Sequence, residues 1–210
     1  MILRQPNPKS AVLVLDDICM FDEEIILKGC REGKRSAQKQ LYDKYVSPML
    51  AICLRYSKSR DEAEDLLQEG FLKIFQNINT YRKHGSLEGW IKRIMINHAL
   101  NQYKKNRKIP FAEDVDSINE NEILSVHEEI ENNEPVPAEI LLAMIQSLPE
   151  GYRMVFNLYV FEGYSHREIA ESINFSENTS KTQLMKARRQ LQEKIFEYTN
   201  MKETALVNER

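Results

Sequence analysis

The stretch from Tyr164 to Leu191 constrains this chain more than any other, because it predicts two short helices joined by a sharp turn. Ser165 and Glu168 have the spacing of a capping box, which begins a helix. Asn174 tolerates the left-handed conformation that a sharp turn needs, and Ser176 is suited to cap a second helix. The pattern favours a helical fold that contains a helix-turn-helix.

The second helix of this pair is predicted to have one buried and one basic face. Leu184, Ala187 and Leu191 recur at spacings of three and four, so they should point inward. The outward positions carry donors that fit the major groove of duplex DNA. These positions are Lys181, Thr182, Gln183, Met185, Lys186, Arg188 and Arg189. An ordinary helical hairpin with a solvated basic face fits the same pattern, so both interpretations stay open.

The formal net charge of −3 over 210 residues is unusual for a nucleic-acid binder, but the charge is unevenly distributed. Residues 81–108 contain eight basic side chains and one acid, Glu88, interleaved with aromatic and amide side chains. Cations bind phosphates, while rings and amides can contact unpaired bases. Residues 109–137 contain nine acids and no Lys or Arg, which indicates a linker or weakly ordered segment.

The chain is therefore predicted to be all-α, with two small helical domains joined by a flexible acidic linker. The predicted ranges are an N-terminal extension at 1–20, a first module at 21–108, the linker at 109–137, a second module at 138–200, and a frayed tail at 201–210. Pro48 is expected to kink or split the second helix of the first module. Such a linker would let the modules engage DNA sites about two turns, or ~70 Å, apart.

Other classes of protein find little support in the sequence. Three cysteines, Cys19, Cys30 and Cys53, have no paired spacing and indicate a reducing compartment. The apolar run at 11–15 is too short to span a membrane. No glycine-rich phosphate loop or metal-binding histidine spacing is present. We expect a cytoplasmic protein that is not an enzyme and holds neither a metal nor another cofactor.

The helix expected to begin near Ser59 carries an acidic outer face made of Asp61, Glu62, Asp65, Gln68 and Glu69. Acids in the first turn complement the helix dipole. Because Asp65 and Glu69 lie beyond that turn, a surface for a basic partner helix is the other interpretation.

Two ordered blocks of sequence resemble the extracytoplasmic-function, or group four, sigma factors of the sigma-70 family. DEAEDLLQEGFLKIFQNINTY followed by GSLEGWIKRIMINHALNQYKKNRK is similar to their region two. LPEGYRMVFNLYVFEGYSHREIAESI followed by SENTSKTQLMKARRQL is similar to their region four. The resemblance implies a factor that binds core RNA polymerase, recognises the −10 and −35 elements of promoter DNA, and aids promoter melting. It also implies that an anti-sigma protein could hold the chain.

Roles for individual residues follow from that resemblance. Asp61, Asp65, Gln68 and Glu69 match the helix that docks on the polymerase clamp. The positions that match the −10 contacts are Tyr81, Arg82, Lys83, His84, Trp90, Arg93, Asn97, Lys104, Lys105 and Arg107. Trp90 matches a wedge aromatic, although apolar neighbours on its helix make core packing an alternative. The positions that match the −35 recognition face are Lys181, Thr182, Met185, Lys186 and Arg188.

The sequence departs from the family pattern at two positions of the helix-turn-helix. Asn174 stands where a turn glycine is common, and Ser180 stands where a buried valine is usual. Alternative functions remain open: a helix-turn-helix regulator that does not bind polymerase, or a helical scaffold for protein partners. A further hypothesis is that the acidic linker competes with DNA for the basic helix, an inhibition that added salt would weaken.

Overall fold

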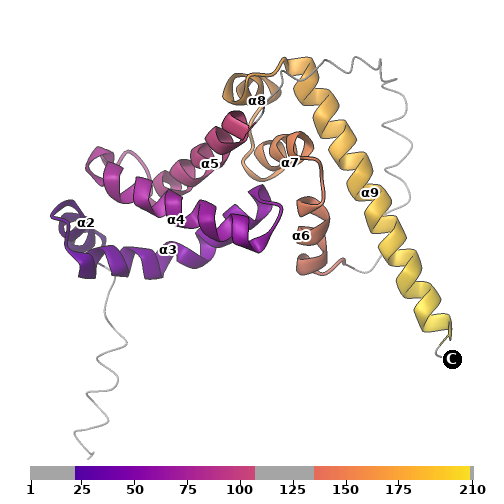
Figure 1. Cartoon of the computed structure of the whole chain (residues 1–210), viewed down its shortest axis with the longest axis horizontal. Coiled ribbons are helices and arrows are strands. Elements are labelled where there is room, and N and C mark those ends of the chain that lie inside the picture. Colours follow the sequence, from indigo (N-terminus) through magenta and orange to yellow (C-terminus); the bar gives the residue numbers. More distant parts are fainter. Residues whose placement is uncertain (1–21, 107–134, 209–210) are drawn as a thin grey trace, which may run out of the picture.

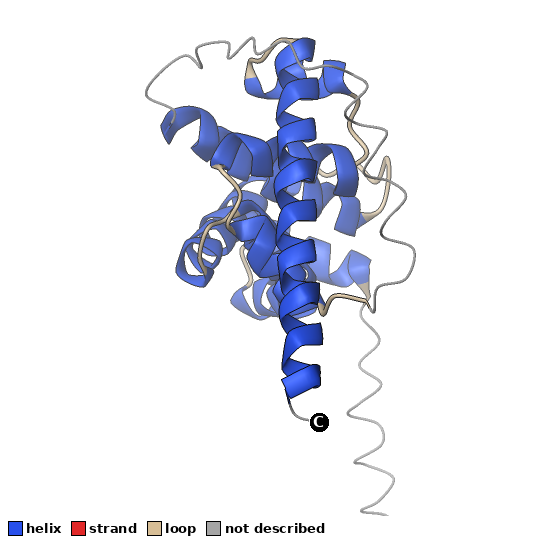
Figure 2. Ribbon diagram, turned by 90° about the vertical axis from the view of Figure 1, so that its right-hand side faces the viewer, coloured by secondary structure: helices blue, strands red, loops and turns tan. Residues whose placement is uncertain are grey.

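The computed structural model describes residues 22–106 and 135–208, with side chains as far as residue 202. This part of the chain consists of helices joined by short loops and contains no strand, which confirms the all-α prediction (Figures 1 and 2). The elements are α2 (Glu23–Arg31), α3 (Arg35–Tyr56), α4 (Arg60–Asn77), η1 (Ile78–Thr80), α5 (Leu87–Asn106), α6 (Ala138–Gln146), α7 (Glu150–Phe156), η3 (Asn157–Phe161), α8 (His166–Ile173) and α9 (Glu177–Asn208).

Side-chain caps fix the starts of the helices where the sequence predicted them. Ser59 Oγ accepts a hydrogen bond from the backbone N–H of Glu62, and the Glu62 carboxylate accepts one from Lys58 N–H. Ser165 and Glu168 form a complete capping box at the start of α8. These bonds satisfy backbone donors that a helix start leaves without intrahelical partners.

Helix lengths differ from expectation at two places. Of the two alternatives at Pro48, a kink or a split, the split does not occur, since α3 continues through this residue. The Pro48 ring is exposed, so water can donate a hydrogen bond to the carbonyl that loses its intrahelical donor. The tail predicted to fray after residue 200 instead continues α9 to Asn208. At 1.5 Å per residue this helix is about 48 Å long, and its second half extends beyond α6 (Figure 1).

The first module is built around α3, which packs against α2, α4 and α5. In the second module α7 and α8 pack against α9, and α6 lies beside both α9 and α3. One buried apolar cluster spans both modules, because it includes Leu41 and Met95 from the first and Val155 and Ile169 from the second. The modules therefore contact each other directly, in addition to being connected through residues 107–134.

Candidate nucleic-acid interface

The loop between η1 and α5 is held by bonds at both of its ends. The Tyr81 ring is buried, and its hydroxyl donates to Gly85 O at 2.8 Å. Arg31 of α2 donates to Tyr81 O at 3.1 Å. Tyr81 was expected on the DNA-contacting surface. The structure places its ring in the core instead, because it fills the space beneath the loop and packs against Trp90 with centroids 5.5 Å apart.

The middle of this loop presents exposed polar side chains, two of which are cationic. Arg82, Lys83 and His84 are all exposed. Lys83 has a φ of 59°, a left-handed conformation that few non-glycine residues adopt, and its ammonium pairs with Glu24 of α2. The hydrogen bond to Glu24 raises the pKa of Lys83. The loop is thus tied to α2, while Arg82 and His84 are left facing solvent.

The predicted basic face of α5 is exposed along the helix. Arg93, Asn97 and Lys104 share one side of α5, Lys105 lies next to that side, and all four reach solvent. Arg107 lies outside the described residues. Trp90 is half-buried and packs against the core, which supports the alternative of a packing role for this residue.

The recognition-helix positions of α9 differ in exposure. Lys181 and Arg188 are exposed, while Thr182, Met185 and Lys186 are half-buried. Leu184, Ala187 and Leu191 are buried as predicted. The prediction that Gln183 points outward is wrong, because this residue is only 2% exposed. Its amide lies beneath Gly151 of α7, where a Cβ would sit 3.0 Å from Gln183 Oε1.

The turn between α8 and α9 accommodates both departures from the family pattern. Asn174 adopts the left-handed conformation, with φ 55° and ψ 54°. Ser180 is fully buried, and its Oγ lies 3.0 Å from His166 Nδ1. A hydrogen bond between the two helices therefore stands where an apolar contact would otherwise be expected.

An aromatic cluster that sequence reasoning missed supports the same helix. The Tyr159 ring of η3 stacks on His166, with centroids 4.8 Å apart, and the Arg188 guanidinium lies 5.6 Å from the Tyr159 centroid. Burial lowers the pKa of His166, and the charges of Lys181 and Arg188 lower it further. No spacing motif marks Tyr159, because its contacts join three separate elements.

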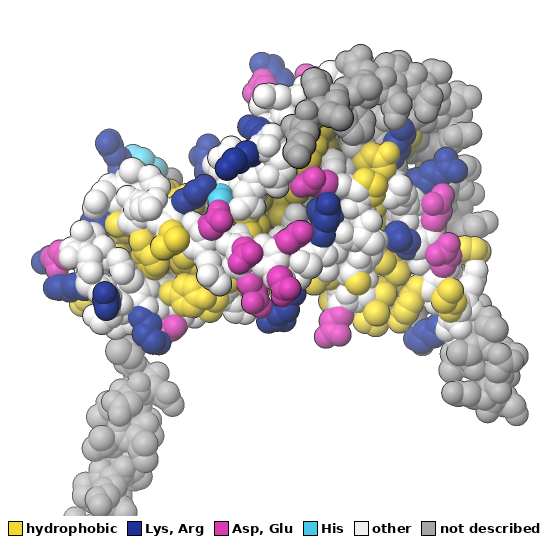
Figure 3. Space-filling view, viewed as in Figure 1, with side chains coloured by type: hydrophobic (Ala, Val, Ile, Leu, Met, Phe, Trp, Pro, Cys, Tyr) yellow, Lys and Arg dark blue, Asp and Glu magenta, His cyan; other side chains and the backbone are white. Residues whose placement is uncertain are grey.

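The acidic face of α4 is exposed as predicted at Asp61, Asp65 and Gln68. Glu69 is also exposed but is engaged: its carboxylate accepts from Gln102 at 3.2 Å and lies 3.0 Å from His98 Nε2 of α5. Leu72, on the same side of α4, is exposed. Figure 3 shows acidic side chains gathered near the middle of one face, with hydrophobic patches beside them.

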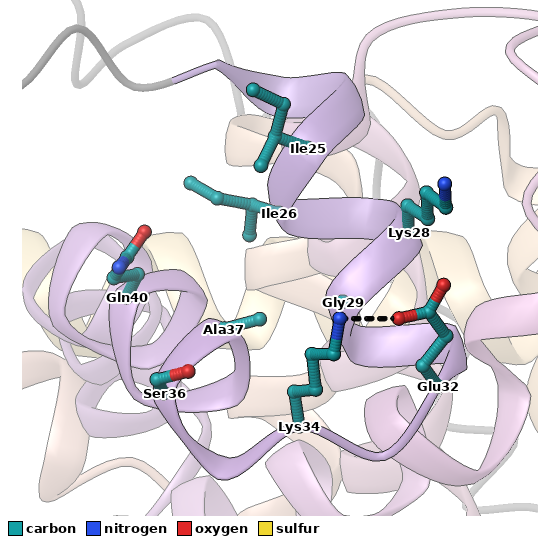
Figure 4. Close-up of a pocket in the computed structure, with 9 residues that line it drawn as sticks. All are labelled: Ile25, Ile26, Lys28, Gly29, Glu32, Lys34, Ser36, Ala37 and Gln40. Atoms are coloured by element: carbon teal, nitrogen blue, oxygen red, sulfur yellow. Dashed lines mark ion pairs between the residues drawn. The ribbon is translucent and has the colours of Figure 1, made fainter.

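Other kinds of site have little support in the described ranges. Within 22–106 and 135–202, no group of three or more metal-ligating side chains comes together. A shallow hollow of about 390 Å³ lies between α2 and α3 (Figure 4), where the charged groups Glu32 and Lys34 pair at 2.6 Å. None of the described helices has the length and hydrophobicity of a membrane span.

Two protein-family models match the chain. The model described as Sigma-70 region 2 matches residues 41–109, which include α4, the loop and α5. The model described as Sigma-70, region 4, matches residues 138–191, which run from α6 into α9. The two matches occur in this order and leave the intervening segment uncovered.

Individual proteins of known identity are also similar to the chain. The ECF RNA polymerase sigma-E factor of Escherichia coli (strain K12) is 27% identical over 180 residues, covering 82% of this chain and 94% of that protein. Its namesake in Haemophilus influenzae is 26% identical over 180 residues, covering 82% and 95%. Among solved structures, the sigma factor RpoE of Bartonella quintana, in complex with the anti-sigma factor NepR, is 23% identical with a TM-score of 0.46, covering 75% of this chain and 95% of that one.

Proposed function

The chain belongs to the extracytoplasmic-function group of the sigma-70 family, and from that premise we propose that it binds core RNA polymerase and directs it to a specific set of promoters. The observation that carries the proposal is the pair of matches to regions 2 and 4 in family order. Each matched segment contains a helix with an exposed basic face, as a protein that contacts two separate DNA elements requires.

The proposed polymerase-docking surface is the exposed face of α4. Asp61, Asp65 and Gln68 present charge and hydrogen-bonding groups to solvent, and Leu72 adds apolar area beside them. This combination suits a basic helix of a partner, because complementary charge steers the encounter while apolar contact holds it. We give Glu69 a smaller part in docking, since its carboxylate already contacts Gln102 and His98 of α5.

The proposed −10 surface combines the loop after η1 with α5. Arg82, Lys83 and His84 would contact an unpaired base of the −10 element and its phosphates, while Arg93 and Asn97 would follow the melted strand toward Lys104 and Lys105. Tyr81 holds the loop from beneath. We assign Trp90 to this support as well, because its ring packs on Tyr81.

The proposed −35 surface is the first part of α9, placed in the major groove. Lys181, Thr182, Met185, Lys186 and Arg188 would face the DNA. The π-face of Tyr159 orients Arg188 toward a phosphate or base edge. We propose module boundaries at 21–108 and 138–200, with residues 1–20, 109–137 and 201–210 outside the two DNA-contacting modules.

The proposed factor is non-enzymatic and works with a partner enzyme. We propose that the polymerase performs all the catalysis and that the chain acts in the cytoplasm, where the polymerase is found. Capture by an anti-sigma protein is also proposed, as the family resemblance implies; the similar sigma factor RpoE of Bartonella quintana was solved in complex with the anti-sigma factor NepR.

The test is transcription in vitro with purified chain, bacterial core RNA polymerase and a genomic promoter library, followed by sequencing of the start sites. We expect new start sites that share two upstream motifs. The double variant Asp61→Lys, Asp65→Lys should weaken polymerase association by at least about tenfold, because like charges at an interface cost several kcal/mol. The double variant Asp43→Lys, Glu197→Lys, which makes the same charge change at exposed sites on α3 and α9, is the matched control.

Two outcomes would count against the proposal. If no new transcripts form and polymerase binding is also absent, a helix-turn-helix regulator that acts without polymerase becomes the better description. If transcripts form but the double variant binds polymerase as well as the control does, the docking surface lies elsewhere than on α4.

A further inference from the structure

The C-terminal end of α3 is capped by side chains of the other module. The last carbonyls of a helix have no intrahelical partners. Here Leu54 O accepts from Gln146 Nε2 at 2.9 Å, and Arg55 O accepts from Asn157 Nδ2 at 2.9 Å. Tyr56 O accepts from Arg153 Nε at 3.3 Å. Three consecutive carbonyls of the first module are thus satisfied by α6, α7 and η3.

Arg153 is suited to this position because it is cationic and buried. Its side chain is 1% exposed, and its Nη1 also donates to Gln146 O and Leu148 O at 2.9 Å each. The guanidinium therefore lies where α3 and α6 both end, at the negative ends of two helix dipoles. Burial lowers the pKa of Arg153. A buried cation needs such compensation, since removing it from water is costly.

Glu162 adds a charged contact that exists only between the modules. Its carboxylate is 3% exposed and lies 3.1 Å from Arg55 Nη2 and 2.6 Å from Lys92 Nζ. Arg55 also covers the Phe161 ring at 4.3 Å. Lys92 neighbours Arg93 on α5, so an acid of the second module neutralises a cation next to the proposed −10 surface.

This arrangement brings the two DNA-contacting helices too close together for a promoter. Tyr103 near the end of α5 contacts Phe175 in the turn before α9, with ring centroids 6.5 Å apart. The segments from Arg93 to Tyr103 and from Glu177 to Lys186 are each about 15 Å long at 1.5 Å per residue. Promoter elements two turns of B-DNA apart are separated by ~70 Å.

From these contacts we propose that Gln146, Arg153, Asn157 and Glu162 form an inter-module latch that holds the free chain in a closed, inhibited form. The latch must open before both proposed DNA surfaces can engage one promoter. The inhibitory part of this proposal rests on the proposed sigma-factor function, whereas the closed form itself does not. Polymerase, which we propose binds α4, must then favour the open form by holding the modules apart.

The closed form is tested by small-angle X-ray scattering on the full chain. Glu162→Lys places a third cation beside Arg55 and Lys92, and both of the ion pairs it breaks lie between modules, so each module keeps its own contacts. Glu197→Lys makes the same charge change at an exposed site on α9 and is the matched control. We expect the wild type and the control to have the same radius of gyration and Glu162→Lys to have a larger one.

The inhibitory role is tested on a duplex that spans a promoter recovered by the transcription experiment. Because apparent affinity scales with the populated fraction of the competent form, Glu162→Lys should bind this duplex at least about tenfold more tightly than Glu197→Lys. The milder Glu162→Gln, which keeps the side-chain shape, should show a smaller gain in the same direction.

The outcomes separate the two proposals. A wild-type radius of gyration equal to that of Glu162→Lys would overturn the latch, whether or not the chain directs transcription. Expansion of Glu162→Lys without tighter promoter binding, in a chain whose wild type does direct transcription, would overturn the inhibitory role. Expansion in a chain that directs no transcription would support the closed form and refute the proposed function.

Discussion

His98 connects the proposed polymerase-docking helix to the proposed −10 helix through its buried imidazole. Its side chain is 3% exposed. The Lys73 ammonium of α4 lies 2.7 Å from Nδ1, so Nδ1 acts as the acceptor and the neutral ring carries its proton on Nε2, 3.0 Å from the Glu69 carboxylate. Protonation would place a second N–H opposite the ammonium. Burial and the charge of Lys73 lower the pKa of His98, while Glu69 opposes that shift.

This contact predicts a loss of stability in mild acid. Because the folded pKa lies below the unfolded value of about 6.5, the unfolded chain binds the proton more readily, and stability falls as the pH drops below ~6.5. His98→Gln removes this titration but leaves His166, whose pKa is also lowered. Urea unfolding at pH 7 and pH 5 should show a smaller acid-induced loss in His98→Gln than in the wild type. An equal loss would mean that His98 does not contribute.

The turn residue Asn174 allows a second prediction at this scale. Its φ of 55° lies in a region that costs an ordinary L-residue about 1–2 kcal/mol. Asn174→Ala should therefore lower the free energy of unfolding by about 1 kcal/mol, whereas Asn174→Gly, which has no Cβ, should equal or exceed the wild type. Urea denaturation of the three chains compares them. A stable alanine variant would show that the turn can adopt another conformation.

At the scale of whole elements, α2 and α3 approach each other closely at Gly29. A Cβ added at Gly29 would lie 2.6 Å from the Ala37 Cβ, and neither atom can move without its helix. Gly29→Ala should thus force the helices apart and destabilise the chain by about 1–3 kcal/mol. Gly85→Ala, whose added Cβ meets nothing within 4 Å, should change stability by less than about 0.5 kcal/mol. Equal thermal midpoints for these two variants would refute this account of the packing.

Local sequence patterns predicted most of the elements because their signals lie within one or two helical turns. The caps at Ser59 and Ser165 and the buried spacing of Leu184, Ala187 and Leu191 depend only on near neighbours. Gln183 was misplaced because its burial depends on Gly151, which lies far away in the sequence.

The same limit explains what was missed in the candidate site. Exposure of Arg93, Asn97 and Lys181 follows from helical periodicity, but the Tyr81 ring is buried through packing against Trp90 of α5, a contact that no local spacing indicates. Roles for the site residues came from the family resemblance and remain predictions. No sequence pattern indicated that Glu162 would pair with Arg55, because 107 positions separate them.

At the scale of the whole molecule, two inhibitory mechanisms make opposite predictions about salt. The acidic-linker hypothesis depends on charges in residues 109–137, which lie largely outside the described residues, and exposed charges are screened beyond about 10 Å at 0.1 M salt. The latch instead uses bonds to three main-chain carbonyls and a carboxylate that is 3% exposed. Short, buried contacts of this kind are screened much less.

We therefore expect the wild-type chain to keep the same radius of gyration between about 0.05 M and 0.5 M NaCl. Promoter affinity will fall with salt for every variant, because phosphate contacts release counterions. The informative quantity is thus the ratio of affinities between Glu162→Lys and Glu197→Lys, which the latch predicts to stay well above one throughout. If salt expands the wild type and brings this ratio to one, closure depends on screened surface charge, and the acidic linker becomes the better explanation. If the wild-type radius of gyration and the ratio of promoter affinities both stay constant with salt, the inhibition comes from the latch at the end of α3.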